Sequence, residues 1–196
     1  LAGGLLERIG LAEGRMEYRR GTDGKITTER PIPNHQAGIS MVLASLTDPV
    51  SGALGSLSEI QAVGHRIVHG GERFTQPVEI TNEVISEIEQ NSFMAPLHNP
   101  ANLLGIRAAM EMLEGVRNVA VFDTSFHQTM PPVAYVYPLT WDLYKEKGFR
   151  RYGFHGTSHQ YVAERTAAML GRPLSELNTI VCHLGNGSSI TAVKQG

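Results

Sequence analysis

The chain has 196 residues, of which 41% are hydrophobic, and this is enough to bury a core. Its 17 Lys and Arg residues nearly balance 19 Asp and Glu residues, which argues against a nucleic-acid-binding surface or a polybasic membrane patch. The single cysteine, Cys182, cannot form an internal disulfide, and no apolar run is long enough to cross a bilayer. We therefore expect a cytoplasmic protein without nucleic-acid or membrane partners.

The first third of the chain predicts strands followed by a helix. The opening LAGGLLERIG has an apolar run that is too short for a signal peptide. Residues 16–32 alternate polar and apolar side chains around Asp23-Gly24, which predicts a β-hairpin. Asn34 is a good helix cap, and apolar residues at helical spacing follow it up to Leu46. The expected buried stripe of this helix consists of Ile39, Val42, Leu43 and Leu46.

The middle of the chain predicts a strand and two helices. Residues 62–71, AVGHRIVHGG, are typical of a buried strand. Thr81 is suited to cap a second helix. Asn99-Pro100 supplies a cap and a first-turn proline for a third helix, which we expect to end at Gly115.

The last third predicts a strand, an irregular aromatic-rich connection, a helix and a hairpin. The strand covers residues 118–126, and the helix runs from about Thr157 or Ser158 to Leu170. The closing TIVCHLGNGSSITAVKQG reads as two strands around a Gly-Asn-Gly turn. Strands that alternate with helices indicate an α/β fold, and the early hairpin indicates mixed sheets.

Three predicted strands end in polar residues, where ligands gather in α/β folds. Arg66 lies in an otherwise apolar strand, so it is either a partnered structural arginine or a bidentate ligand for a carboxylate or phosphate. Asp123 either caps the turn toward Thr124 and Ser125 or presents its carboxylate to a ligand. His183 ends the third of these strands.

Further histidines stand at positions where they could act on an anion. His155 immediately precedes the last predicted helix, and the field of a helix N-terminus favours negative charge. His155 and His159 have the spacing of a metal pair, but the glutamate of an HExxH motif is absent and we do not expect zinc. GTSHQ lacks the GxSxG pattern of serine hydrolases. His98 is either a structural or a catalytic histidine.

The Gly-Asn-Gly turn is either a plain hairpin turn or a phosphate cradle. Gly185, Asn186 and Gly187 can adopt positive φ and can aim backbone N–H groups into a concavity, to which Ser188 and Ser189 add hydroxyl donors. A Walker loop is excluded, because its Gly-Lys-Ser/Thr ending is missing. Apolar residues beside the polar candidates are either core or the lining of a small pocket, namely Val68, Leu97 and Phe154.

Five segments, taken together and in order, resemble the acetate kinase family, which belongs to the superfamily of sugar kinases and actin. They are GHRIVHGGERF, APLHNPANLLGI, VFDTSFHQTMP, YGFHGTSHQYV and CHLGNGSSI, and the resemblance spans nearly the whole chain. It implies a two-domain, actin-like ATPase fold of the RNase H-like class, with mixed sheets flanked by helices. A change of composition after Phe126 then separates an acetate-binding domain, residues 1–126, from the start of an incomplete nucleotide-binding domain, residues 127–196.

The resemblance also implies a reaction, in which ATP phosphorylates acetate and gives acetyl phosphate and ADP. Arg66 would bind the acetate carboxylate, and Asp123 would be the catalytic carboxylate. His155 would stabilise the transition state, and His98 would be a further active-site histidine. The pocket for the acetate methyl group would consist of Val68, Leu97 and Phe154. The loop for the ATP phosphates would consist of His183, Leu184, Gly185, Asn186 and Gly187.

With acetate as the phosphoryl acceptor, the role of Asp123 as a proton acceptor is questionable. A carboxylic acid with a pKa of roughly 4 to 5 is ionised at neutral pH and needs no general base. We therefore favour an electrostatic role for Asp123, which would orient Arg66 or hold the hydration shell of a magnesium ion. The family further implies Mg²⁺ or Mn²⁺ as cofactor, although no metal ligand can be assigned in this chain, and it implies a homodimer.

Family members extend beyond both ends of this sequence, so we expect a fragment that is inactive alone. Within the family, a propionate or butyrate kinase is the nearest alternative. A phosphatase with Asp123 as nucleophile is disfavoured, because Ser125 stands where a second aspartate is expected. A non-catalytic nucleotide-binding module is the third alternative.

Overall fold

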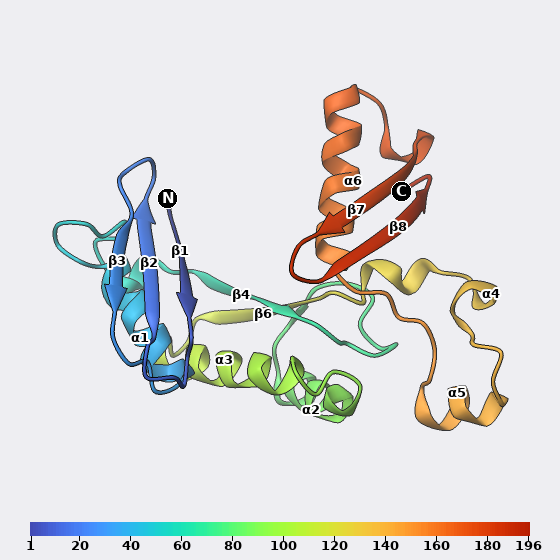
Figure 1. The fold of residues 1–196 in the computed structure, drawn as a ribbon, viewed down its shortest axis with the longest axis horizontal. Coiled ribbons are helices and arrows are strands. Elements are labelled where there is room, and N and C mark those ends of the chain that lie inside the picture. Colours follow the sequence, from blue (N-terminus) through green and yellow to red (C-terminus); the bar gives the residue numbers. More distant parts are fainter. The chain divides into compact units, whose positions relative to one another are not determined.

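The computed structural model describes residues 1–196, which form two compact units (Figure 1). The first unit consists of Leu1–Gly64 and Ala101–Asn118, and the second of His65–Pro100 and Val119–Gly196. The domain boundary expected after Phe126 falls inside the second unit and stays a prediction. None of the helices has the length and apolar content that a membrane span requires.

The first unit contains a three-stranded antiparallel sheet in the order β1 (Ala2–Glu7), β2 (Arg15–Arg20) and β3 (Ile26–Glu29). The predicted hairpin is confirmed, because β2 pairs with β3 and Tyr18 lies opposite Ile26. Strand β1 was not predicted. It pairs with β2 along its whole length, but most of its side chains are exposed, so its sequence lacks the alternation that marks a half-buried strand.

Helix α1 (His35–Leu46) follows this sheet and begins as predicted. The Asn34 side chain accepts a hydrogen bond from the Ala37 backbone N–H at 2.8 Å. The predicted buried stripe is only partly correct, because Val42 is 37% exposed. Gly38 faces Leu6 of β1. The buried face of α1 is therefore directed toward this unpredicted strand. The core of the unit is built from Met16, Ile32 and Met41, with Leu6 and Ile9 packed against it.

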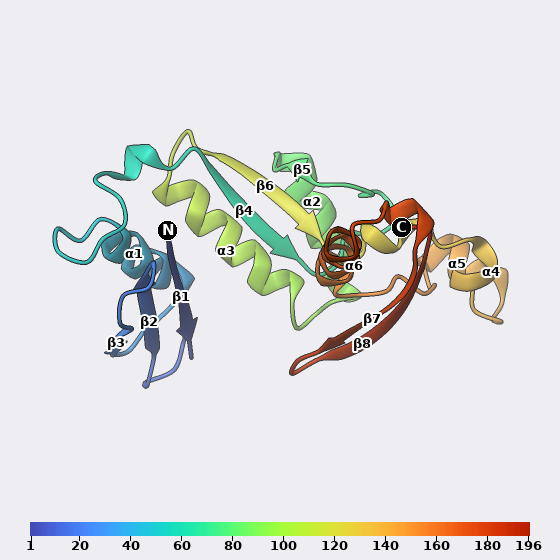
Figure 2. The same cartoon turned by 90° about the horizontal axis from the view of Figure 1, so that it is seen from above.

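Three elements run from one unit into the other, namely β4 (Ala62–Ile67), α3 (Asn99–Met112) and β6 (Arg117–Phe122). In the sheet β4-β6-β5, the short β5 (Val78–Glu79) pairs antiparallel with β6. Strands β4 and β6 run in the same direction (Figure 2), so the sheet is mixed, as predicted. The backbone N–H of Asp123 donates to the Ile67 carbonyl at 2.8 Å, which brings the ends of β4 and β6 together.

Helix α2 (Asn82–Gln90) has the predicted cap, because Thr81 Oγ1 accepts a hydrogen bond from the Val84 N–H. The predicted cap at Asn99 is wrong. Asn99 is itself the first residue of α3, and its buried side chain bonds both the backbone N–H and the carbonyl of His69. The loop after β4 needs these partners because its backbone is buried.

The expected irregular connection contains short helices, namely η3 (Phe126–Thr129), α4 (Pro132–Tyr135) and α5 (Trp141–Lys147). Helix α6 (Gly156–Leu170) and the predicted hairpin of β7 (Asn178–Leu184) and β8 (Ser188–Lys194) complete the second unit. One face of this hairpin packs on α6 and η3 through Ala163, Val181, Val193 and Phe126. The remaining short helices are η1 (Leu57–Glu59), η2 (Asn91–Phe93) and η4 (Leu174–Glu176).

Candidate active site

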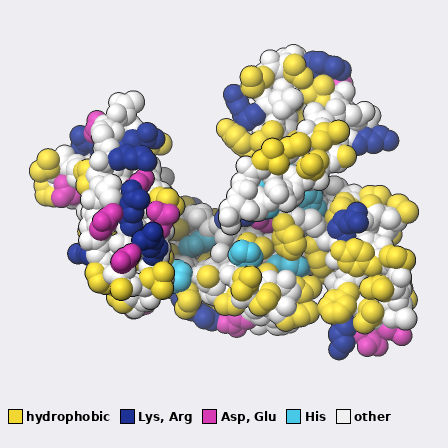
Figure 3. Space-filling model, viewed as in Figure 1, with side chains coloured by type: hydrophobic (Ala, Val, Ile, Leu, Met, Phe, Trp, Pro, Cys, Tyr) yellow, Lys and Arg dark blue, Asp and Glu magenta, His cyan; other side chains and the backbone are white.

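A cavity of about 690 Å³ in the second unit gathers most of the predicted site residues. Several histidine side chains reach the surface among hydrophobic ones just below the tip of the β7–β8 hairpin (Figure 3). Leu184 and Gly185 do not line the cavity, and Leu184 is 77% exposed. The predicted residues in the lining are Arg66, Val68, Leu97, His98, Asp123, Phe154, His155, His183, Asn186 and Gly187.

Arg66 and Asp123 form a bidentate ion pair across the ends of β4 and β6. Arg66 Nε donates to Oδ1 at 3.0 Å and Nη2 donates to Oδ2 at 2.6 Å. Asp123 is buried, whereas the Arg66 side chain is 59% exposed. The hydrogen bond to Asp123 raises the pKa of Arg66. Asp123 uses only one edge of the guanidinium, and the Nη1–Nη2 edge keeps N–H donors for an anion in the cavity.

Asp123 also fixes the backbone at the start of α6. Its Oδ2 accepts a hydrogen bond from the His155 N–H at 3.2 Å, and its carbonyl accepts one from the Gly156 N–H at 3.0 Å. His155 is the N-cap of α6 and has left-handed backbone angles, with φ 56° and ψ 25°. Such a conformation is uncommon outside glycine and persists where neighbours enforce it. The two hydrogen bonds to Asp123 supply that enforcement.

The His155 ring stacks on the His183 ring, with centroids 4.1 Å apart and planes 18° from parallel. His155 Nδ1 lies 2.9 Å from Ser189 Oγ, and His183 Nδ1 lies 2.9 Å from Ser158 Oγ. Burial lowers the pKa of His155, and the nearby His183 ring lowers it further. Both effects favour the neutral form of the ring.

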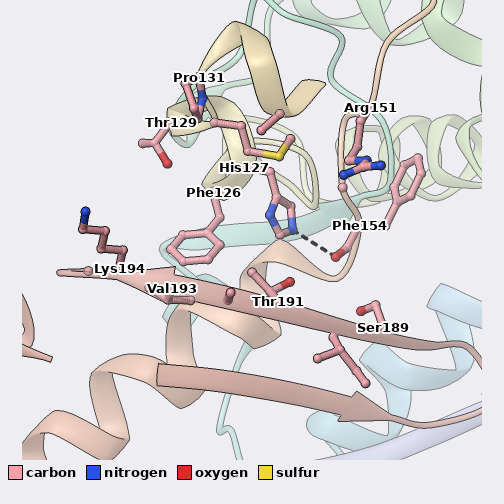
Figure 4. Close-up of a pocket in the computed structure, with 16 residues that line it drawn as sticks. Phe126, His127, Thr129, Pro131, Arg151, Phe154, Ser189, Thr191, Val193 and Lys194 are labelled. Atoms are coloured by element: carbon pink, nitrogen blue, oxygen red, sulfur yellow. Dashed lines mark hydrogen bonds between the residues drawn. The ribbon is translucent and has the colours of Figure 1, made fainter. Parts of the chain in front are cut away.

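Two more histidine rings, those of His159 and His127, lie near this part of the site. His159 is fully buried, and its Nε2 lies 2.8 Å from the same Ser189 hydroxyl oxygen. His127 Nε2 donates to the Phe154 carbonyl at 3.1 Å (Figure 4). Burial lowers the pKa of both rings. The spacing of His155 and His159 thus brings both rings to one hydroxyl, and no group of three or more metal-ligating side chains is present.

The Gly-Asn-Gly turn does not have the expected backbone conformation. None of its three residues has positive φ, so that part of the prediction is wrong. The hairpin register closes at Leu184 opposite Ser188, and this turn is made without left-handed residues. Gly187 lies close to His155 instead, and a Cβ there would be a tight 3.3 Å from the His155 Cε1 and Nε2 atoms.

Sequence reasoning expected the Ser189 hydroxyl as a donor to phosphate, but not as a partner of imidazole rings, and it missed the contacts of Ser158 and of the buried His127. Ser158 and Ser189 contact the rings of His183 and His155, and His127 holds the Phe154 carbonyl. The i,i+4 spacing of His155 and His159 is a usable signal for a shared partner, although it points first to metal binding. The contacts of the two serines with the histidine rings give no signal, because the partners come from other elements.

The residues of this cavity do not fit a magnesium site. Mg²⁺ requires oxygen ligands in near-octahedral geometry. Both oxygens of Asp123, the one carboxylate in the lining, already accept hydrogen bonds from Arg66 and His155. The other polar groups in the lining are an arginine, imidazoles and an Asn side chain. The arrangement is instead suited to bind anions, with a guanidinium edge and a neutral imidazole next to an apolar wall.

The chain matches the model of the Acetokinase family over residues 1–196. Acetate kinases of Thermotoga maritima and Alkaliphilus metalliredigens are each 53% identical to it over 196 residues, which are 48% and 50% of their lengths. The crystal structure of Porphyromonas gingivalis acetate kinase superposes with a TM-score of 0.92 at 46% identity, and 49% of that chain is covered.

A propionate kinase structure from Francisella tularensis gives a TM-score of 0.90 at 37% identity, with 48% of that chain covered. The predicted α/β class, with the actin-like ATPase fold and mixed sheets, is confirmed by these structures. The chain spans about half the length of the relatives that it matches.

Proposed function

Since this chain belongs to the acetokinase family, we propose that it supplies the acetate pocket and part of the ATP site of an acetate kinase. The reaction transfers the γ-phosphoryl group of ATP to acetate and gives acetyl phosphate and ADP. The observation that carries the proposal is the buried Asp123, which holds the Arg66 guanidinium and the His155 backbone in one cavity.

Acetate binds with its carboxylate on the Nη1–Nη2 edge of Arg66. That edge faces an anion while the other edge stays on Asp123, so the guanidinium cannot rotate away. The methyl group lies against Val68, Leu97 and Phe154, which line the same cavity. Leu97 is 85% exposed in this chain, so this wall is open to the surrounding solvent.

Transfer is a direct in-line displacement. An acetate oxygen forms the new bond to the γ-phosphorus while the bond from that phosphorus to the ADP oxygen breaks, and ADP leaves with the bonding electrons. Catalysis of this kind depends on positioning and on neutralising charge. Arg66 neutralises the attacking carboxylate, and the His155 ring donates a hydrogen bond to the transferring group. Asp123 touches neither reactant and acts by positioning both side chains.

The nucleotide phosphates lie along His183, Asn186 and Gly187, which line the cavity, with Leu184 and Gly185 completing the loop. The backbone N–H groups of Asn186 and Gly187 and the neighbouring His155 ring are the donors that this chain offers, because the Gly185 N–H already donates to the Gly187 carbonyl at 3.1 Å. The cofactor Mg²⁺, or Mn²⁺, stays an expectation from the family, and we route no step through it. His98, which is exposed at the rim of the cavity, is a further contact for the substrates.

Two further properties belong to the proposal. We place the protein in the cytoplasm as a homodimer, as the family resemblance suggests. Because the chain spans about half of its relatives, we also propose that the 196 residues alone do not catalyse the transfer. Assaying the isolated 196-residue polypeptide tests this directly, since any turnover would refute it.

A kinase for a longer acid is the second candidate, because a propionate kinase structure is also closely similar. The test uses the complete gene product that contains these residues and measures acyl phosphate formation with acetate, propionate and butyrate. We expect the highest kcat/KM with acetate. A preference of tenfold or more for propionate or butyrate would replace the assignment, and ATP binding without any transfer would support a non-catalytic module.

A further inference from the structure

One hydroxyl oxygen lies between two imidazole rings in the second unit. Ser189 Oγ is 2.9 Å from His155 Nδ1 and 2.8 Å from His159 Nε2. The serine comes from β8, whereas the histidines are the N-cap and a first-turn residue of α6. His159 is fully buried, and its other ring nitrogen, Nδ1, has no hydrogen-bond partner.

Counting protons decides the direction of these hydrogen bonds. A serine hydroxyl carries one hydrogen, and the structure offers that hydrogen no acceptor other than the two rings, so Ser189 donates to one neutral ring and accepts from the other. If it donated to His159 Nε2, the proton of that neutral ring would sit on Nδ1, as a buried N–H without an acceptor. Such groups are rarer in folded proteins than unpaired acceptors. His159 therefore donates from Nε2 to Ser189, and Ser189 donates to His155 Nδ1.

We propose that Ser189 and His159 are positioning residues, which hold the neutral His155 ring in the tautomer that carries its proton on Nε2. With Nδ1 occupied as an acceptor, Nε2 has the one N–H of the ring. This nitrogen lies beside the Gly-Asn-Gly turn, since a Cβ on Gly187 would be 3.3 Å from it. The opposite tautomer would present a lone pair to phosphate oxygens at this point and repel them.

The inference deepens the proposed function and rests on it, because His155 is the donor to the transferring phosphoryl group. A catalytic imidazole in the wrong tautomer can lose most of its effect while its position is unchanged. The hydroxyl of Ser189 and the donor of His159 should thus affect the rate of transfer more than the binding of either substrate.

The first experiment compares variants of the complete gene product. Ser189→Ala should lower kcat about 10-fold or more, with the KM values for acetate and ATP within about twofold of wild type. Ser189→Thr keeps the hydroxyl and should recover most of the rate. Thr191→Val is the matched control, because it removes a hydroxyl from the same face of β8 without changing side-chain shape, and it should keep full kcat.

His159 needs a paired comparison, because it is buried and its loss can affect folding. His159→Gln retains an N–H donor near the position of Nε2, whereas His159→Leu removes it. We expect the Gln variant to keep more kcat than the Leu variant at matched thermal stability. An equal rate in these two, or a Ser189→Ala enzyme with wild-type kcat, would overturn the proposal.

A second readout does not depend on activity. In protein carrying ¹⁵N-labelled histidine rings, the ring-nitrogen shifts report which nitrogen is protonated. At about pH 8, where histidines are neutral, we expect His155 to be protonated on Nε2 in the wild type and to become a mixture in Ser189→Ala. Protonation of His155 on Nδ1 in the wild type would refute the proposed hydrogen bonds from His159 to Ser189 and from Ser189 to His155. Failure of the proposed function would instead appear as absence of acetyl phosphate from a wild-type protein with this ring pattern.

Discussion

At the scale of single residues, Asp123 explains much of the site. Its side chain accepts hydrogen bonds from the Arg66 guanidinium and from the His155 backbone, and its carbonyl accepts one from the Gly156 N–H. The sequence left two roles open for Asp123 and two for Arg66. In the structure Arg66 is a partnered arginine that also lines the cavity, and we propose that its remaining edge binds the anion.

Replacing Arg66 tests this edge. We expect Arg66→Ala in the complete gene product to lower kcat/KM for acetate about 10- to 100-fold, since a hydrogen bond to a charged group is typically worth about 1.5–3 kcal/mol. The KM for ATP should change much less. Arg66→Lys should recover only part of the loss, because an ammonium group cannot form the bidentate pair.

The control for Arg66 is Arg73→Ala. Arg73 is similarly exposed, at 58%, and pairs with Glu87 outside the cavity lining. The Arg73→Ala variant should have unchanged kcat and KM for acetate. An Arg66→Ala enzyme with wild-type acetate kcat and KM would show that the guanidinium only stabilises Asp123.

His155 should act on the rate and not on binding. We expect His155→Ala to reduce kcat about 10²-fold or more with little change in either KM, as for a donor to charge that develops in the transition state. Because the pKa of His155 lies below its usual 6.5, the active neutral ring persists as pH rises above that value. Steady-state rates should therefore not fall between pH 6.5 and about pH 8 through this group, whereas a need for the imidazolium would make them fall.

At the scale of elements, the end of β6 and the start of α6 are locked together. A Cβ on Gly156 would lie 2.2 Å from the Asp123 carbonyl oxygen, which is impossible without a backbone shift. We expect Gly156→Ala to destabilise the fold by about 1–3 kcal/mol, as for other overpacked positions, and to lower kcat by displacing His155.

Gly105→Ala is the matched control for Gly156, because Gly105 also lies in a helix but a Cβ added to it would meet no neighbouring atom within 4 Å. Thermal melting and steady-state kinetics of both variants check the prediction. Equal melting temperatures and equal kcat values for the two variants would contradict the tight contact between the end of β6 and the start of α6.

The elements also show what the sequence could predict. Capping residues and periodicity located α1, α2, α6 and the β7–β8 hairpin, because these signals are local. Strand β1 was missed because its exposed side chains give no pattern, and the role of Asn99 because its partners lie in the loop after β4. Most residues of the cavity lining were expected from the motifs, but Met94, Ala95 and Pro96 were not. The contacts of Ser189 with the two histidine rings depend on how β8 meets α6 and have no sequence signature.

At the scale of the whole molecule, several histidines are buried or half-buried, and this burial favours their neutral form. Burial lowers the pKa of His69 to about 4, and it also lowers the pKa values of His127, His155 and His159. In the unfolded chain these groups titrate near the ordinary value of 6.5, so below it the unfolded state binds more protons. The free energy of unfolding should therefore decrease as pH falls from about 6.5 toward 4.

Denaturant unfolding at a series of pH values measures how the free energy of unfolding depends on pH. In the wild type, His69 Nδ1 accepts a hydrogen bond from the Gly71 N–H at 3.1 Å, and an asparagine side chain keeps an acceptor for it. The His69→Asn variant should therefore fold, and its free energy of unfolding should decrease less on acidification than that of the wild type. A wild-type stability that is flat over this pH range would contradict the assignment of these rings as neutral.

The central claim is that this chain holds acetate for direct attack on the γ-phosphorus of ATP. Its most direct test follows a single turnover of the complete gene product with ATP and ¹⁸O-labelled acetate. We predict acetyl phosphate whose bridging oxygen carries the label, formed in equal amount with ADP. Release of phosphate from ATP without labelled acetyl phosphate, or phosphate trapped covalently on Asp123, would contradict the account.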